Sequence, residues 1–270
     1  VTGVQTCALP IYELAGVGRG LRDHIDYIVG STSPRRDVLG FSPSGVARLV
    51  AGVFEYRRRG RGIPATNFAE SGGFLKTRPG LARPDVQLHF VPAIIEDHAR
   101  RIRLAHGFSC HVSVLRPESA GSVRLASANP LTPPRIDPAF LDAHEDVDTL
   151  ARGVRKVVEI LEQAPLAPWR GRSLRGEAGL TDVELVRALR NHADSAYHPV
   201  GTCRMGTDAM AVVDPELRVR GLDGLRVVDA SIMPTLIGGN TNAPTIMIAE
   251  KAIDLIRGLP GPDWPKPRGP

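Results

Sequence analysis

Two periods of apolar residues divide the chain into different kinds of element. Residues 86–90 and 108–114 alternate apolar and polar side chains, which predicts strands that bury one face. Residues 122–126 are a third, shorter strand candidate. Because brief turns separate these candidates, we expect them to form an antiparallel sheet.

Further along the chain, the apolar period lengthens to that of a helix. Residues 145–163 have an apolar face, and the acidic residues near their start suit the positive end of a helix dipole. Thr181 and Glu184 form the S/T-x-x-E pattern of a capping box, so a second helix is predicted to begin there. A shorter helical pattern covers residues 46–56. The chain is therefore predicted to mix helices and strands.

The C-terminal region is predicted to run from a strand through a loop into a helix. Residues 225–228 have the composition of a short strand, and a loop rich in Gly and Asn spans 238–242. Pro244 suits the first turn of the helix that follows, and Gly258 suits its end.

Composition is typical of a soluble globular protein and excludes several other classes. Hydrophobic residues make up 42% of the chain, which is too many for a wholly disordered protein. No apolar run approaches the roughly 18 residues of a membrane-spanning helix. The cysteines, Cys7, Cys110 and Cys203, are too few for a disulfide scaffold. Because no H-E-x-x-H or C-x-x-C spacing occurs, we expect no metal site.

The basic excess is weak evidence for a nucleic-acid partner. The formal net charge is +5, but only four of the 34 basic residues are lysines, a usage typical of a GC-rich genome. The run 57–62 (RRRGRG) favours a nucleic-acid-binding module as an alternative function. It lacks interleaved aromatic side chains beyond Tyr56, so a solvated loop is the better interpretation and no nucleic-acid partner is expected.

Both ends of the chain differ from the rest. Residues 1–11 carry no charge and no clear period, and each of them matches the in-frame translation of a common sequencing-library adapter. We interpret them as non-native, with an apolar N-terminal strand as the alternative. Cys7 is then not native, and the native N-terminus is missing. Residues 259–270 are rich in Pro and Gly, which predicts a flexible tail.

His198 is the histidine whose neighbours point to chemistry. Pro199 prevents a helix from continuing and favours an extended backbone at His198, while Gly201 and Gly206 permit tight turns. An imidazole on such a loop suits acid–base catalysis near neutral pH. The alternative is a loop histidine that only hydrogen-bonds the backbone. The other histidines are expected to be structural or to lie on the surface.

Asparagines precede the predicted C-terminal helix. At Asn240 and Asn242, free backbone N–H groups and the helix dipole would favour an electron-rich ligand. Their amides can hydrogen-bond a substrate oxygen or a cofactor edge. The alternative is that Asn242 only caps the helix. Asp229 follows the predicted strand 225–228, at the carboxyl end where open α/β sheets bind ligands.

Taken together, these segments resemble the C-terminal signature of the glucose–methanol–choline (GMC) flavoprotein oxidoreductases. The matching blocks are, in order, 198–206 (HPVGTCRMG), 212–215 (VVDP), 224–234 (GLRVVDASIMP) and 239–245 (GNTNAPT). Upstream, 16–24 (GVGRGLRDH) and 115–123 (LRPESAGSV) also match, although Gly20 replaces the usual Asn. The resemblance covers about residues 12–258 and is greatest to choline dehydrogenase-like and aliphatic-alcohol dehydrogenase-like members.

The resemblance implies an α+β and α/β architecture with two domains. Residues 12–30 and 196–258 would belong to an FAD-binding Rossmann-type domain. Residues 31–195 would form a substrate domain built on an antiparallel sheet.

The resemblance also implies a catalytic pair. His198 would be the base that takes the alcohol proton as a hydride passes to flavin N5, and Asn240 would hydrogen-bond the substrate oxygen. The residues that would approach the FAD are Asp229, Ala230, Asn242 and Thr245.

A substrate role is implied for Glu70. It matches a position where choline-handling relatives place a glutamate near the quaternary ammonium, and a charge at a strand edge is the alternative. The substrate would be a small primary alcohol, either choline or an aliphatic or aromatic alcohol, oxidised to the aldehyde. A quinone or carrier protein would accept the electrons. An oxidase that uses oxygen and a lyase are the alternatives within the family.

We expect a cytoplasmic or membrane-associated enzyme. Once Cys7 is set aside, Cys110 and Cys203 are not placed to suggest a disulfide, which favours a reducing compartment. The oligomeric state stays open.

The family's dinucleotide fingerprint, G-x-G-x-x-G after a first strand, is absent. The chain is therefore expected to be the C-terminal half of an enzyme and inactive by itself.

We predict that the purified chain retains little or no FAD, because the glycine turn and helix N-terminus that hold the pyrophosphate are missing. The flavin absorbance of the purified protein measures this. Stoichiometric yellow flavin would contradict it.

Overall fold

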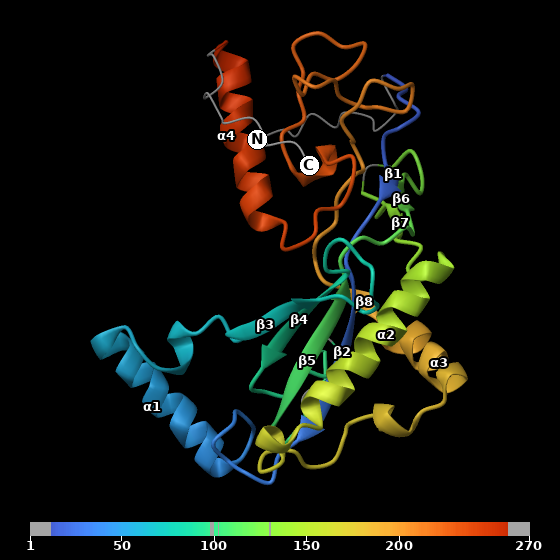
Figure 1. Cartoon of the computed structure of the whole chain (residues 1–270). Helices are drawn as coiled ribbons and strands as arrows, with labels where there is room; N and C mark the ends of the chain where they lie inside the picture. The colour runs from blue at the N-terminus through green and yellow to red at the C-terminus, as the bar shows by residue number, and fades with distance from the viewer. Residues whose placement is uncertain (1–11, 98–99, 102, 130, 259–270) are drawn as a thin grey trace. The chain divides into compact units, whose positions relative to one another are not determined.

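The computed structural model describes residues 12–97, 100–101, 103–129 and 131–258 (Figure 1). The proposed adapter residues 1–11, with Cys7, and the proposed tail 259–270 lie outside the described residues. The described chain divides into two compact units. Unit 1 takes residues 12–23, 120–139 and 198–258, and unit 2 takes residues 24–119 and 140–197.

Unit 2 is built on a five-stranded antiparallel sheet. Its strand order is β3-β4-β5-β2-β8 (Figure 1). The strands are β2 (Ile25–Thr32), β3 (Ser71–Leu75), β4 (Val86–Val91), β5 (Gly107–Val114) and β8 (Asp194–Ser195). The predicted strands 86–90 and 108–114 are β4 and β5, and they pair in antiparallel register as expected.

The sheet has one apolar and one polar face. Because side chains alternate along a strand, Tyr27, Val86 and Val112 share the face that contributes to the main core. Asp26 and His111 lie on the opposite face. The alternation in the sequence therefore sends apolar side chains to the core and polar side chains, several of them buried, to the opposite face.

Helix α2 (His144–Leu161) covers the apolar face. Its buried stripe packs into the same core as the sheet and consists of Val147, Leu150, Val154, Val157 and Leu161. A Cβ at Gly153 would lie 2.8 Å from Val112 Cγ2, so glycine lets the helix approach β5 closely. The predicted helix 145–163 is thus confirmed, with its start and end shifted by one or two residues.

Two further helices of unit 2 begin at side-chain caps. α3 (Asp182–His192) starts with the predicted capping box, in which Thr181 and Glu184 bond each other's backbone N–H groups. α1 (Pro43–Arg59) is capped by Ser42, whose Oγ accepts the Gly45 N–H at 3.1 Å. Short 3₁₀ turns fill the connections: η1 (Ile63–Ala65), η3 (Ala164–Leu166) and η4 (Glu177–Gly179).

Unit 1 joins three stretches that lie far apart in sequence. A small antiparallel sheet of order β1-β6-β7 pairs β1 (Arg19–Leu21), β6 (Gly121–Arg124) and β7 (Arg135–Asp137). A second core contains residues of the loops 200–219, the 3₁₀ turn η5 (Ala230–Ile232) and helix α4 (Asn242–Arg257). α4 is the predicted C-terminal helix, and Gly258 ends it in the left-handed conformation.

Two sequence predictions for unit 1 need correction. Residues 225–228 form no strand, because only Arg226 makes an isolated bridge, to Arg218. A strand needs a neighbouring strand that pairs with it over several residues, and in this segment only one residue pairs. The predicted strand 122–126 ends at Arg124, where its pairing with β7 ends.

The compact units do not follow the domain limits expected from the sequence at every point. Residues 24–30 lie in unit 2, because β2 pairs with β5 and β8. Residues 120–139 lie in unit 1, because β6 pairs with β1.

We predict that Leu150→Ala lowers the free energy of unfolding by about 2–5 kcal/mol, because it opens a cavity at a fully buried position of α2. Urea unfolding of the whole chain measures the change. Val183→Ala on α3, where the side chain is 71% exposed, is the matched control and should change it by less than about 0.5 kcal/mol. Equal effects of the two substitutions would show that the core is placed incorrectly.

Candidate active site

His198 lies on a loop of unit 1 that is held by backbone hydrogen bonds. Its own N–H donates to Asp23 Oδ1 at 2.9 Å. Two residues later, Val200 and Arg22 exchange backbone bonds of 2.9 and 3.0 Å. The half-buried imidazole is therefore carried by a segment tied to the N-terminal part of the same unit.

The imidazole of His198 meets the amide of Asn240. Asn240 Nδ2 lies 3.4 Å from His198 Nε2, although the two residues are 42 positions apart. When the amide donates, Nε2 is the acceptor and carries a lone pair. A neutral imidazole with a lone pair on Nε2 is the form that can take a proton. The structure thus brings together the two residues that the family resemblance pairs.

Asn240 stands just before the start of α4. The N-cap of this helix is Thr241, which makes no side-chain cap bond, and Asn242 is the exposed first residue. The alternative that Asn242 caps the helix is therefore wrong. The hydroxyl of Thr245 donates to the Thr241 carbonyl at 2.7 Å.

The start of α4 fits an electron-rich group. Its first turn contains no acidic residue, and no side chain caps its N–H groups. Backbone N–H donors, the helix dipole and the Asn242 amide form a donor set that suits the carbonyl or phosphate oxygens of a flavin nucleotide.

Asp229 and Ala230 lie in the same unit at η5. The Asp229 carboxylate accepts the Ser231 N–H at 2.7 Å and so caps this turn, in place of following a strand. The Met205 N–H donates to the Ile232 carbonyl at 2.7 Å, which ties η5 to the segment after His198. η5 and α4 contact each other, so the candidate cofactor-binding residues on both elements lie in one region of unit 1.

Glu70 belongs to unit 2. It is exposed and directly precedes β3, an edge strand of the five-stranded sheet. The structure therefore places it at the edge of the sheet of unit 2.

Sequence reasoning assigned no role to two buried aspartates. Asp23, 7% exposed, accepts the His198 N–H. Asp26, 2% exposed, accepts His111 Nδ1 at 2.6 Å and Ser113 Oγ at 2.9 Å. The alternation of β5 places His111 and Ser113 on one face, but no local signal identifies a partner 85 residues away. For Asp23, the signal in the sequence was its place beside His24 at the end of the motif block 16–24 (GVGRGLRDH).

The two described cysteines are poor nucleophiles. Burial raises the pKa of the Cys110 thiol to about 12. Burial also raises the pKa of the half-buried Cys203 thiol. Both therefore stay protonated at neutral pH. Within the residues that the structure describes, no group of three His, Cys, Asp or Glu side chains is arranged to hold a metal ion.

Comparison with known proteins adds the family. The profile of the GMC oxidoreductases matches residues 117–249. An alcohol dehydrogenase (acceptor) of Pseudomonas putida is 44% identical over 91% of this chain, and mitochondrial choline dehydrogenase of Homo sapiens is 42% identical over 93%. The chain belongs to the GMC oxidoreductase family. It spans 45% and 42% of the length of these two relatives.

Solved GMC oxidoreductases share the fold. Pyridoxine 4-oxidase from Mesorbium loti superposes with a TM-score of 0.76 at 26% identity, and covers 93% of this chain with 45% of its own. Formate oxidase of Aspergillus oryzae superposes with a TM-score of 0.81 at 24% identity, and covers 92% of this chain with 48% of its own. The expected fold class is therefore confirmed, and FAD is the cofactor of this GMC family. No helix among the described residues is long and apolar enough to span a bilayer.

We predict that Asp23→Ala speeds hydrogen exchange of the His198 amide at least about tenfold, because a hydrogen bond to a charged acceptor is lost. Exchange measured on the segment 196–203 tests this. Asp23→Asn, which keeps an acceptor oxygen, should have a much smaller effect. The exposed Asp223→Ala is the control, and an equal change there would contradict the assigned contact.

Proposed function

We propose that this GMC member is the C-terminal part of an FAD-dependent dehydrogenase that oxidises a primary alcohol to the aldehyde. The observation that carries the proposal is the pairing of His198 Nε2 with Asn240 Nδ2 at 3.4 Å beside the uncapped start of α4. The proposed base His198, the hydrogen-bond donor Asn240 and the N–H groups at the start of α4 therefore lie in one compact unit.

In the proposed reaction, His198 removes the hydroxyl proton and holds it on Nε2. Asn240 donates to the substrate oxygen, which stabilises the charge that develops there. When bound, FAD supplies the acceptor for the hydride, at N5. The two hydrogens that the alcohol loses are thus accounted for as a proton on His198 and a hydride on the cofactor. Dividing the task in this way lowers the barrier, since an alkoxide gives up hydride more readily than a neutral alcohol.

The residues of this chain that would hold the cofactor are Asn242 and the first-turn N–H groups of α4. Asp229, Ala230 and Thr245 would support this surface from within the same unit. Because the carboxylate of Asp229 and the hydroxyl of Thr245 already bond the backbone, these side chains shape the surface more than they donate to a ligand.

For the substrate, we infer an alcohol of the kinds named in the relatives. One relative is named for alcohol oxidation and another for choline oxidation. The exposed Glu70 carboxylate supports a cationic alcohol such as choline, which it could pair with. A quinone or carrier protein would accept the electrons. An oxidase that uses oxygen is the second candidate, since a relative is named oxygen-dependent choline dehydrogenase.

The test restores a full-length enzyme by joining residues 12–258 to the N-terminal half of the Pseudomonas putida relative. Anaerobic flavin reduction is then followed with choline, aliphatic and aromatic alcohols. Absence of reduction by any alcohol, in a chimera that binds FAD, would refute the proposed function.

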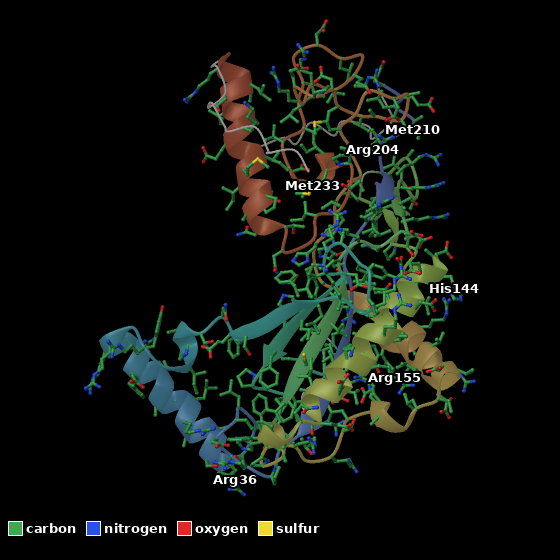
Figure 2. All side chains as sticks on the ribbon, viewed as in Figure 1. Arg36, His144, Arg155, Arg204, Met210 and Met233 are labelled. Atoms are coloured by element: carbon green, nitrogen blue, oxygen red, sulfur yellow. The ribbon has the colours of Figure 1, made fainter. Side chains whose placement is uncertain are left out.

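We predict that His198→Ala in this chimera slows flavin reduction by about 10²-fold or more, the usual contribution of a general base. His144→Ala is the matched control, since Figure 2 shows this side chain at the start of α2, where it is 88% exposed. The control should leave the rate unchanged. Near-normal reduction in His198→Ala would remove His198 from the role of base.

A further inference from the structure

Helix α1 presents an apolar stripe to solvent. Val46, Leu49, Val50 and Val53 follow the spacing i, i+3, i+4, i+7 and therefore share one side of the helix. Their exposed fractions lie between 38% and 50%. Next to them, Phe54 is 62% exposed. Only Gly52 is buried along the whole helix.

Helix α2 of the same unit shows how unusual this is. Its apolar stripe has a comparable spacing, but Val147, Leu150 and Val154 are between 0% and 4% exposed because they pack on the sheet. A surface helix ordinarily buries such a stripe against its own protein. In Figure 1, α1 stands apart from the strands that α2 covers. Among the described residues, nothing buries the α1 stripe fully, and Val46 and Leu49 line an open groove with residues that include Ile95.

Other apolar side chains enlarge the surface. A groove of about 420 Å³ runs beside α1 and is lined by Val46, Leu49, Phe41, Phe68, Ile63 and Ile95. Phe41 and Phe68 are themselves about half exposed. Contiguous exposed apolar area of this kind marks an interaction site more often than chance exposure.

The C-terminal end of α1 is strongly basic. Arg57, Arg58 and Arg59 form its last turn, and Arg61 follows. Glu55 is the only acidic residue of the helix. None of these four arginines forms an ion pair with a described residue, so their charge faces solvent. The helix thus combines an open apolar stripe with an unneutralised cationic end.

We propose that α1 docks this chain onto an anionic lipid surface. The apolar stripe and Phe54 would enter the boundary between headgroups and acyl chains, and the arginines would pair with lipid phosphates. The unpaired arginines favour an anionic lipid surface, because lipid phosphates can pair with them while the adjacent apolar stripe inserts. One amphipathic helix with one basic cluster gives reversible, salt-sensitive binding. The helix lies on the bilayer and does not span it.

Co-sedimentation of the whole chain with vesicles tests the proposal. We expect binding to vesicles of phosphatidylglycerol and phosphatidylcholine in equal parts, and little binding to phosphatidylcholine alone. Binding should fall as salt is raised. Arg58→Gln with Arg59→Gln should weaken the partition at least about tenfold, because each basic residue contributes separately at an anionic surface.

A second variant removes apolar area and keeps the charge. Val50→Ser with Phe54→Ser should also weaken binding to the anionic vesicles, since the stripe would no longer insert. The matched controls change exposed residues elsewhere in unit 2: Arg187→Gln with Arg190→Gln on α3, and Val183→Ser with Ile160→Ser. The controls should bind as the parent chain does. Circular dichroism confirms that each variant is folded.

Three outcomes would overturn the proposal. The first is no binding to anionic vesicles at low salt. The second is binding that the control pairs weaken as much as the α1 pairs do. The third is self-association that Val50→Ser with Phe54→Ser abolishes, without any vesicle binding, which would assign the stripe to a protein interface. None of these outcomes bears on His198, so the lipid proposal and the proposed reaction can fail separately.

Discussion

Hydrogen bonding on both sides of the segment Gly16–Asp23 holds unit 1 together. The Gly18 N–H donates to Thr202 at 2.8 Å, and the Gly18 carbonyl accepts from Val123 at 2.7 Å. Gly18 has a φ of +74°, and a Cβ there would collide with the Val123 carbonyl, so only glycine allows this double pairing. The same segment ends at Asp23, which holds the backbone of His198. The position of His198, the proposed base, thus depends on a segment nearly 180 residues earlier in the chain.

Unit 2 depends on a different constraint, the separation of apolar and polar side chains onto opposite faces of its sheet. Alternation along β2, β4 and β5 sends one set of side chains to α2 and leaves the other set, with the Asp26–His111 pair, on the opposite face. The buried carboxylate is tolerated because His111 and Ser113 both donate to it. Helix α1 departs from this pattern, since the described residues leave its apolar stripe 38–50% exposed. That departure distinguishes a surface for an external partner from part of the core.

The candidate chemistry depends on loops supported by these rigid parts. His198 and Asn240 both lie outside regular elements, but backbone bonds to residues 22 and 23 hold the first, and the start of α4 follows directly after the second. Functional side chains on loops over a rigid support are common, because loops can be shaped to a ligand while the support fixes their position. FAD is the cofactor of the GMC family, and we propose that the uncapped start of α4 offers donors to it.

The sequence alone was sufficient for features that depend on neighbouring residues. It determined α2, the capping box at Thr181, the glycine end of α4 and the paired strands β4 and β5, because periodicity and capping are local. The motif blocks identified His198 and Asn240, but only the tertiary structure showed that they meet. The sequence pattern was insufficient where an element needs a distant partner. Residues 225–228 pair too little to form a strand. Asp23 and Asp26 bond groups that lie 175 and 85 residues away in the chain. Such contacts depend on how the whole chain closes, and no local pattern records that.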